Sequence, residues 1–446
     1  MESVLTGRTP RDEVVYRIIR LLVEPLVIPH ADHQISLDQI DPDALKVLSR
    51  LHKFNHQAYL VGGGVRDLLL GRIPKDFDIG TSAHPNEVKR IFRNCWIIGR
   101  RFRLAHIKFG QKTIEVATFR RKVPNETPSE DQQLTKKRNP GTANDLLKPI
   151  RRDNTFGTAE EDAFRRDFTI NALFYDISTL KVIDYVGGLK DLRNGILRSI
   201  GNPNDRFIED SVRMLRAITF MARLGFQLDP AVHRAIKRHR NEIGKASPAR
   251  MIEELYKILR SGFATLTMRS LSAHGLLSPI APEIEHRKTG LLWRSLESLD
   301  LYRKNSDFIA ENLTNPILLG SLTQPVQPLD LTPPRRRDGK HPIDIKLGRL
   351  PVARRDIERL RQTLQIQPRL QNTNLGVASQ RAVIHRRAFQ EAITWLEIHG
   401  NDLKSLERWK SLAASASLKQ PKVKRRRRPR RRKPSVHNQP ATRTDS

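Results

Sequence analysis

The sequence has almost no cysteine and no long apolar run. Cys95 is the single cysteine among 446 residues, which excludes an intramolecular disulfide and any zinc or iron–sulfur site built from several cysteines. The longest apolar stretches are far too short to span a bilayer, so we predict no membrane span. The first residues, MESVLTGRTPRDE, lack the basic-then-apolar layout of a secretory signal. Together these absences predict a cytoplasmic protein that works under reducing conditions.

Positive charge is what the sequence has in excess. It contains 80 Lys and Arg against 48 Asp and Glu, a formal net charge of +32, which predicts a polyanionic partner such as RNA, DNA or an anionic membrane. Residues 419–433 carry 11 of these Lys and Arg, and about two thirds of the excess lies elsewhere. The folded part is therefore also expected to contact nucleic-acid phosphates, although a basic tail can serve only as a solubility or localisation tag. The tail residues that we predict to bind RNA are Lys424, Arg425, Arg426, Arg427, Arg428, Arg430, Arg431 and Arg432.

The hydrophobic pattern changes near residue 200. Before it, strand-like and helix-like segments alternate, and after it helical patterns dominate, so the predicted fold class is α+β followed by helical domains. The predicted parts are an N-terminal extension (1–40), an α+β domain (41–200), two helical parts (201–290 and 291–411) with a Pro-rich basic linker near 324–351 in the second, and a disordered Arg-rich tail (412–446).

Local signals predict individual elements. Asp41-Pro42 is typical of a helix start, because aspartate caps the helix and proline fits its first turn. DFDIG (76–80) is expected to be a strand, and Gly110-Gln111 is expected to join two strands as a hairpin. Single helices are predicted over 207–225 and 379–398, and a long mobile loop over 121–155.

Three consecutive glycines, Gly62 to Gly64, precede Arg66 and Asp67. The run is not a P-loop, because no Gly-Lys-Ser/Thr follows, and it is not a dinucleotide fingerprint, because Asp67 occupies the position of the third glycine. Glycines nevertheless let backbone N–H groups approach an anion at a helix N-terminus, and Arg66 could add a charge-assisted hydrogen bond. The run is interpreted as a phosphate-binding turn, with a purely structural turn as the alternative.

Asp76 and Asp78 follow this turn closely. On a strand, side chains two residues apart leave the same face, so both carboxylates would point together. Adjacent carboxylates repel one another unless a cation lies between them, and Mg²⁺ binds carboxylate and phosphate oxygens together. The pair therefore predicts a two-metal site, for which a third carboxylate is usual. Glu115 and Asp167 are the candidates, and the sequence alone does not choose between them.

Three spaced motifs resemble those of one protein family. The stretch YLVGGGVRDLLLGRIPKDFDIGTSAHP (59–85) is similar to the head of the class II nucleotidyltransferases of the polymerase β superfamily. This family comprises the bacterial poly(A) polymerases and the bacterial and eukaryotic CCA-adding enzymes. EEDAFRRDFTIN (160–171) and EDSVRMLR (209–216) resemble later motifs of the family, and the resemblance covers roughly residues 40–290. It implies a catalytic polymerase β-like head with a mixed sheet over 41–200, an all-α neck over 201–290 that binds the nucleotide base and RNA, and an all-α RNA-binding body over 291–411.

The resemblance also implies roles for individual residues. Asp76 and Asp78 would hold Mg²⁺, and Asp167 would be the third active-site carboxylate. At Thr219 the family often has an arginine, so one phosphate contact of the family is not expected here. The residues that resemble nucleotide contacts are Gly63, Arg66 and Arg166 for triphosphate or ribose, Asp210 and Arg213 for the base, on one helical face, and Arg216 for phosphate.

Two relatives within this family differ in product. The stretch 97–107, the segment RRAFQEAITWLEIHG (386–400) and the basic tail resemble poly(A) polymerases rather than CCA-adding enzymes. The expected function is template-independent addition of AMP from ATP to RNA 3′ ends by a monomer, with a possible partner in RNA degradation. CCA addition to tRNA and a non-catalytic RNA-binding role are the alternatives.

Overall fold

The computed structural model describes residues 24–99, 103–121, 155–305, 308–332, 345–400 and 402–418. It divides into two compact units, Met1–Ile357 and Glu358–Ser446, which are described separately. None of the helices within the described residues is both long and apolar enough to cross a bilayer. Several sequence predictions lie wholly or largely outside the described residues: the loop 121–155, the central part of the linker 324–351, residues 100–102 of the stretch 97–107, and the tail from Lys424 to Arg432.

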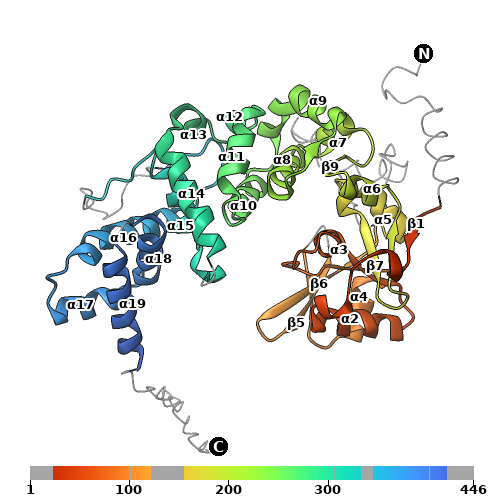
Figure 1. Cartoon of the computed structure of the whole chain (residues 1–446), viewed down its shortest axis with the longest axis horizontal. Helices are drawn as coiled ribbons and strands as arrows, with labels where there is room; N and C mark the ends of the chain where they lie inside the picture. Colours follow the sequence, from red (N-terminus) through yellow and green to blue (C-terminus); the bar gives the residue numbers. More distant parts are fainter. Residues whose placement is uncertain are drawn as a thin grey trace, which may run out of the picture. The chain divides into compact units, whose positions relative to one another are not determined.

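An eight-stranded mixed sheet dominates residues 24–200 (Figure 1). Its strand order is β1-β8-β7-β2-β3-β6-β5-β4, and within it β3 and β6 run parallel while β5 and β6 form an antiparallel hairpin at Gly110. The predicted α+β class with a mixed sheet and the predicted hairpin are confirmed. The strands are β1 (Leu26–Ile28), β2 (Ala58–Val61), β3 (Ile79–Thr81), β4 (Cys95–Ile98), β5 (Leu104–Phe109), β6 (Lys112–Thr118), β7 (Leu173–Asp176) and β8 (Lys181–Asp184).

Two helices cover one face of this sheet. α2 (Pro42–Lys53) begins after Asp41, whose side chain accepts a hydrogen bond from the Asp43 N–H, as the Asp-Pro signal predicts. It lies against β2 and β3, and α4 (Pro85–Ile91) lies against β4 and β5. Alternate residues of β5 and β6, Ile107 and Val116 among them, are buried on this side.

The opposite face is covered over only part of its width. Around β2 and β7, an apolar cluster containing Phe119, Phe174 and Ala163 packs beneath α5 (Ala159–Arg165). Farther along, the outward side chains of β4, β5 and β6 are more accessible: Trp96 is 51% exposed, and the Glu115 side chain is 49% exposed. The smaller helical elements of residues 24–200 are η1 (His30–Asp32), η2 (Leu37–Gln39), α3 (Gly63–Leu69), η6 (Thr169–Asn171) and α6 (Gly188–Arg193).

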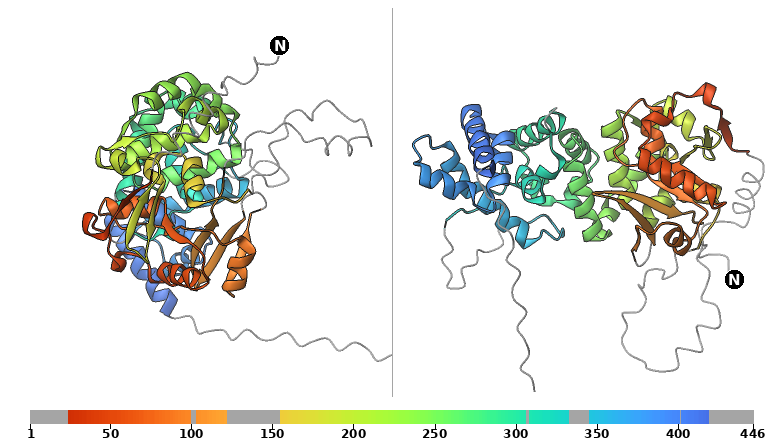
Figure 2. Two further views of the ribbon diagram at one scale, coloured as in Figure 1. Left: turned by 90° about the vertical axis from the view of Figure 1, so that its right-hand side faces the viewer. Right: turned by 90° about the horizontal axis from the view of Figure 1, so that it is seen from below.

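Helices follow the sheet in the rest of the first unit (Figures 1 and 2). A two-stranded parallel pair, β9 (Ile196–Leu197) and β10 (Gln227–Leu228), lies among them. The prediction of one helix over 207–225 is wrong, because the chain turns at Asp210 and Ser211 between two helices. The helical elements are α7 (Pro203–Glu209), α8 (Val212–Leu224), α9 (Pro230–His239), η7 (Arg240–Lys245), α10 (Pro248–Leu259), α11 (Ala264–Ala273), α12 (Leu277–Ile280), α13 (Pro282–Arg287), α14 (Gly290–Lys304), η8 (Ala310–Asn312) and α15 (Asn315–Thr323).

The second unit is a small helical body with its own core. α16 (Arg354–Gln371) starts before its boundary, and α17 (Val377–Ile384), α18 (Phe389–His399) and α19 (Leu403–Leu418) complete it. Trp409 is fully buried in the apolar core, and its indole N–H donates to the Leu370 carbonyl at 2.8 Å. The prediction of a single helix over 379–398 is wrong, because α17 ends at Ile384 and α18 begins at Phe389. The prediction of disorder from 412 onward is wrong for 412–418, which belong to α19.

His399 makes the stability of this unit dependent on pH. Burial lowers its pKa from 6.5 to about 4, and its ring lies 4.2 Å from that of Trp395. Between about pH 6.5 and 4, His399 binds a proton in the unfolded chain but not in the folded chain. The free energy of unfolding therefore decreases as pH falls through this range. Amide hydrogen exchange of α18, corrected for intrinsic rates, should show less protection at pH 5 than at pH 7.5. In His399→Phe this difference should shrink, and an undiminished difference would contradict the assignment.

Candidate active site

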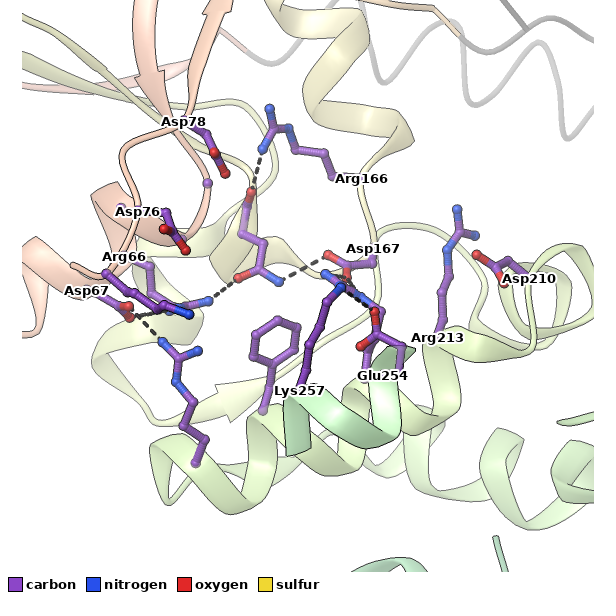
Figure 3. A pocket seen from close by; sticks show the side chains of 18 of the residues that line it. Arg66, Asp67, Asp76, Asp78, Arg166, Asp167, Asp210, Arg213, Glu254 and Lys257 are labelled. Carbon is purple, nitrogen blue, oxygen red and sulfur yellow. Dashed lines mark hydrogen bonds and ion pairs between the residues drawn. The ribbon is translucent and has the colours of Figure 1, made fainter. Parts of the chain in front are cut away.

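One pocket brings together nearly all the residues that the sequence motifs single out (Figure 3). Its volume is about 670 Å³, within the range of small-molecule sites. Its walls come from the turn between β2 and α3, the segment before β3, the segment between α5 and η6, and helices α8 and α10. The predicted site residues among its lining are Gly63, Arg66, Asp76, Asp78, Arg166, Asp167, Asp210, Arg213 and Arg216.

Asp76 and Asp78 lie just before β3 rather than on it. The strand begins at Ile79, so the prediction of a strand over 76–80 is wrong by three residues. Asp78 nevertheless stays in register with the sheet, because its carbonyl accepts a 3.0 Å hydrogen bond from the Val61 N–H. Both carboxylates line the pocket, as Figure 3 shows.

Asp78 is in an environment that disfavours its charge. Burial, followed by the negative charges of Glu115 and Asp76, raises its pKa to about 6, and Arg166 acts in the opposite direction. Three carboxylates thus repel one another at this edge of the sheet. Among the described residues, no group of three or more His, Cys, Asp or Glu is already arranged to hold a metal. The mutual repulsion nonetheless fits a divalent cation, which would relieve it.

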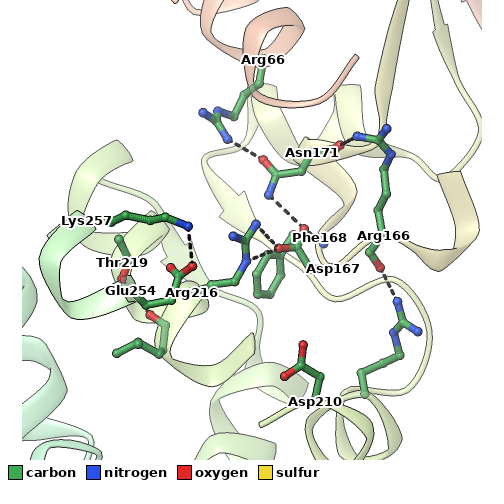
Figure 4. A network of polar contacts seen from close by, with 12 residues as sticks. Arg66, Arg166, Asp167, Phe168, Asn171, Asp210, Arg216, Thr219, Glu254 and Lys257 are labelled. Carbon is green, nitrogen blue, oxygen red and sulfur yellow. Dashed lines mark hydrogen bonds and ion pairs between the residues drawn. The ribbon is translucent and has the colours of Figure 1, made fainter. Parts of the chain in front are cut away.

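The two candidates for a third carboxylate differ in their surroundings. Glu115 lies on β6, and β3 and β6 pair Ile79 with Val116, so Glu115 stands beside Asp78. Asp167 lies on the other side of the pocket, where Arg216 donates to it from Nε at 2.8 Å and from Nη2 at 2.7 Å (Figure 4). Although burial opposes ionisation of Asp167, the Arg216 guanidinium and further hydrogen bonds hold its pKa below the usual range.

A chain of polar contacts runs across the pocket floor (Figure 4). Arg66, only 2% exposed, donates to Asp67 at 2.7 and 2.8 Å and to the side-chain oxygen of Asn171. The Asn171 amide nitrogen donates in turn to Asp167 at 3.1 Å. Because Asp167 also binds Arg216, this chain connects α3 to α8 through η6. Most donors of Arg66 are therefore already used within the protein.

Arg166 is held by an acidic residue outside the pocket. Its Nε and Nη2 donate to Asp162 at 3.0 and 2.9 Å, and its Nη1 donates to the Asn171 carbonyl at 3.1 Å. Gly62 leaves room for this arginine: its φ of +71° disfavours other residues, and a Cβ there would lie 2.9 Å from Arg166 Nη1. The second and third glycines of the run line the pocket as well. The glycine turn and the arginine therefore form one wall.

Two guanidinium groups lie close to one aromatic ring on α8. The carbons Cζ of Arg66 and Arg216 each lie 5.2 Å from the centroid of Phe220. A ring face attracts cations, so Phe220 helps to keep both positive groups in the pocket despite their mutual repulsion. Thr219 lies beside it but bonds to its own helix, donating to the Leu215 carbonyl at 2.8 Å.

Asp210 and Arg213 share the pocket, and their side chains bind different partners. Arg250 of α10 donates to both carboxylate oxygens of Asp210, at 3.2 and 2.9 Å. Arg213 donates to Glu209 at 2.9 Å. The prediction that they lie on one helical face is wrong, because Asp210 caps the end of α7 and Arg213 belongs to α8.

The sequence reasoning missed several lining residues. Asp67 and Asn171 stood inside the quoted motifs, and Asp67 binds Arg223 at 2.8 Å as well as Arg66. Helical spacing would have revealed five more, because residues four and seven apart share one helix face, and the predicted Arg216 is the starting point on α8. The two sets are Arg216, Phe220 and Arg223 on α8, and Arg250, Glu254 and Lys257 on α10.

Comparisons with known proteins show which families and proteins this chain resembles. Residues 58–198 match the family described as poly A polymerase head domain, and residues 225–288 match the family described as probable RNA and SrmB-binding site of polymerase A. Poly(A) polymerase I of Salmonella typhi is 49% identical over 258 residues, which are 58% of this chain and 54% of that protein. The CCA-adding enzyme of Bacillus subtilis (strain 168) is 34% identical over 259 residues, 57% of this chain and 59% of that protein.

The chain thus spans a little over half the length of these curated relatives. Among solved structures, the Bacillus stearothermophilus CCA-adding enzyme in complex with CTP matches with a TM-score of 0.53 and 25% identity. That match covers 85% of this chain and 84% of the other.

Proposed function

We propose that this chain belongs to the nucleotidyltransferase family of the poly(A) polymerases and the CCA-adding enzymes, whose members it resembles over more than half of its length. Within that family, it adds AMP from ATP to RNA 3′-hydroxyl ends without a template. The RNA hydroxyl attacks the α-phosphorus in line, and pyrophosphate leaves. The observation that carries nucleotidyl transfer is the pocket that unites the Asp76 and Asp78 carboxylates with many basic side chains. The choice of adenylate over CCA addition rests on 49% identity to a poly(A) polymerase against 34% to a CCA-adding enzyme.

The pocket's charge suits a nucleoside triphosphate. Nine of its lining residues are Lys or Arg and six are Asp or Glu, so the cations exceed what the carboxylates neutralise. Arg166 and the glycine turn face the triphosphate, and Arg213 and Asp210 face the base. Because Arg250 holds both oxygens of Asp210, it fixes which hydrogen-bonding edge this carboxylate presents. Positioning of this kind accounts for much of the rate of phosphoryl transfer.

Magnesium is part of the proposal. Asp76 and Asp78, with Glu115, would hold the ions, which neutralise phosphate charge and activate the attacking hydroxyl. Glu115 is favoured over Asp167 because its charge acts on Asp78 across the β3–β6 pair. Asp167 is assigned a positioning role, since its carboxylate already binds Arg216 and Asn171.

RNA binding extends beyond the pocket in this proposal. Residues 225–288 match a family described as probable RNA and SrmB-binding site of polymerase A, which supports RNA contact there. A partner in RNA degradation remains a prediction. The basic tail residues Lys424 to Arg432 would add phosphate contacts without sequence preference. A cytoplasmic location and a monomeric state remain predictions.

Incubation with single nucleotides tests the proposal. We expect the protein with Mg²⁺ and ATP alone to build long tails on a generic RNA, and CTP alone to give little or no extension. Incorporation limited to CTP and then ATP on a truncated tRNA would instead show CCA addition. No Mg²⁺-dependent incorporation with either nucleotide, beside intact RNA binding, would show a non-catalytic RNA-binding protein.

A further inference from the structure

The outward face of β4, β5 and β6 carries a row of side chains that starts at the proposed metal ligands. The strand pairs place Glu115 opposite His106 and His106 opposite Trp96. Asp78 stands beside Glu115 at the other end. Directly opposite residues on neighbouring strands point to the same face, so Asp78, Glu115, His106 and Trp96 form one line across four strands, which we call the cross-sheet row.

The row ends in an aromatic side chain, Trp96, that is largely exposed to solvent and not packed into the protein core. Trp96 is 51% exposed, and the ammonium group of the exposed Lys108 lies 5.2 Å from its ring centroid. Ile98, two residues along the same strand and on the same face, is 48% exposed. An exposed indole beside a cation is the combination that binds single-stranded nucleic acid, in which bases stack on the ring and phosphates meet the charge.

The row also leads away from the nucleotide pocket. Asp78 lines that pocket, whereas Glu115, His106 and Trp96 do not. A reaction between a nucleotide and an RNA end needs two substrates to meet at the carboxylates from different directions. The pocket on one side suits the triphosphate, so the cross-sheet row on the other side is free for the RNA.

We propose that the cross-sheet row is the binding platform for the 3′-terminal nucleotides of the RNA, with a base stacked on Trp96 and a phosphate near Lys108. This proposal rests on the proposed function, since it names where that site holds its second substrate. Strands lie about 4.8 Å apart, so three strand steps separate Asp78 from Trp96 by about 14 Å. At roughly 3.4 Å per stacked nucleotide, Trp96 meets about the fourth nucleotide from the 3′ end.

Binding of a short oligonucleotide tests the platform without requiring activity. The probe is hexa-adenylate with a 5′ fluorescein and a free 3′-hydroxyl, added to the full-length protein without ATP and followed by fluorescence anisotropy. Trp96→Ala is expected to weaken binding about tenfold, the size of a lost base–aromatic stack. Trp96→Phe is expected to retain most of the affinity, because phenylalanine also stacks.

Phe54 provides a matched control on the same sheet domain. It is 50% exposed and lies 5.9 Å from the Arg50 guanidinium, but it ends α2 on the helix-covered face. Phe54→Ala should leave binding unchanged. If Phe54→Ala and Trp96→Ala weaken binding equally, or neither does, the platform is overturned.

Cross-linking tests the predicted position along the RNA. Placing 4-thiouridine at each position in turn and irradiating should label the peptide that contains Trp96 most strongly near the fourth nucleotide from the 3′ end. Labelling of that peptide only from the 5′ end would overturn the proposal.

Failure of the platform and failure of the function give different results. If wild-type protein extends RNA with ATP and Trp96→Ala binds the hexanucleotide normally, the platform is wrong and the function stands. If wild-type protein incorporates no nucleotide while binding still depends on Trp96, the platform stands and the transfer activity is wrong.

Discussion

Replacing Asp78 with asparagine is expected to lower AMP incorporation at least about a thousandfold without weakening the fold. Loss of a metal-binding carboxylate removes several kcal/mol of transition-state stabilisation, and each ~1.4 kcal/mol is tenfold in rate. The stability of the metal-free Asp78→Asn variant should be higher than that of the wild type. Burial and the charges of Glu115 and Asp76 disfavour the Asp78 carboxylate, so a neutral amide of the same shape removes an unfavourable interaction.

Two measurements on the same variant separate these effects. Radiolabelled ATP incorporation gives the activity, and the melting temperature in EDTA at pH 7.5 gives the stability of the metal-free protein. A suitable control is Asp43→Asn, because Asp43 pairs with Lys46 on the outer side of α2 and should change activity little. Near-normal incorporation by Asp78→Asn would refute the two-metal assignment, and a much lower melting temperature would refute the repulsion.

Much of the sheet could be predicted because its signals are local. The Asp41 cap and the left-handed Gly110, with a φ of +60°, act within a few residues, and both mark the element ends that they indicate. The helix break at Asp210 was not predictable in this way. Its flanks, 207–225, have an unbroken helical pattern. At the break, the Asp210 carboxylate accepts from the nearby Val212 N–H at 3.3 Å and also from Arg250, 40 residues away, which no local pattern indicates.

The candidate site could be predicted as a set of residues but not as an arrangement. Motif residues from three separated segments do line one pocket. The choice between Glu115 and Asp167 depends on the parallel pairing of β3 with β6, which no short-range pattern encodes. The position of Trp96 could not be predicted for the same reason. That it lies in line with Asp78 on one face of the sheet becomes clear only when the register of the paired strands is known.

The role of Asp167 can be decided by comparing asparagine with leucine at that position. If Asp167 positions Arg216 rather than holding metal, Asp167→Asn keeps an acceptor for Arg216 and should lose only about tenfold in activity. Asp167→Leu leaves Arg216 without its partner, and it should lower activity about a hundredfold through misplacement of the pocket. It should also lower stability, because the Asp167 side chain is only 11% exposed and its loss leaves the partly buried Arg216 charge without its partner.

The double variant Asp167→Leu/Arg216→Met tests whether the lost stability of Asp167→Leu comes from the unpaired Arg216 charge. Replacing a whole buried pair with apolar side chains of similar size is often neutral, so most of the stability lost in Asp167→Leu should return. Activity should not return, since Arg216 also lines the nucleotide pocket. If Asp167→Asn is as inactive as Asp78→Asn while remaining as stable as wild type, Asp167 acts in the chemistry itself and the positioning assignment is wrong. A tenfold loss with an unchanged KM for RNA would instead leave Glu115 as the third carboxylate, because the metal site would have survived the loss of the Asp167 charge.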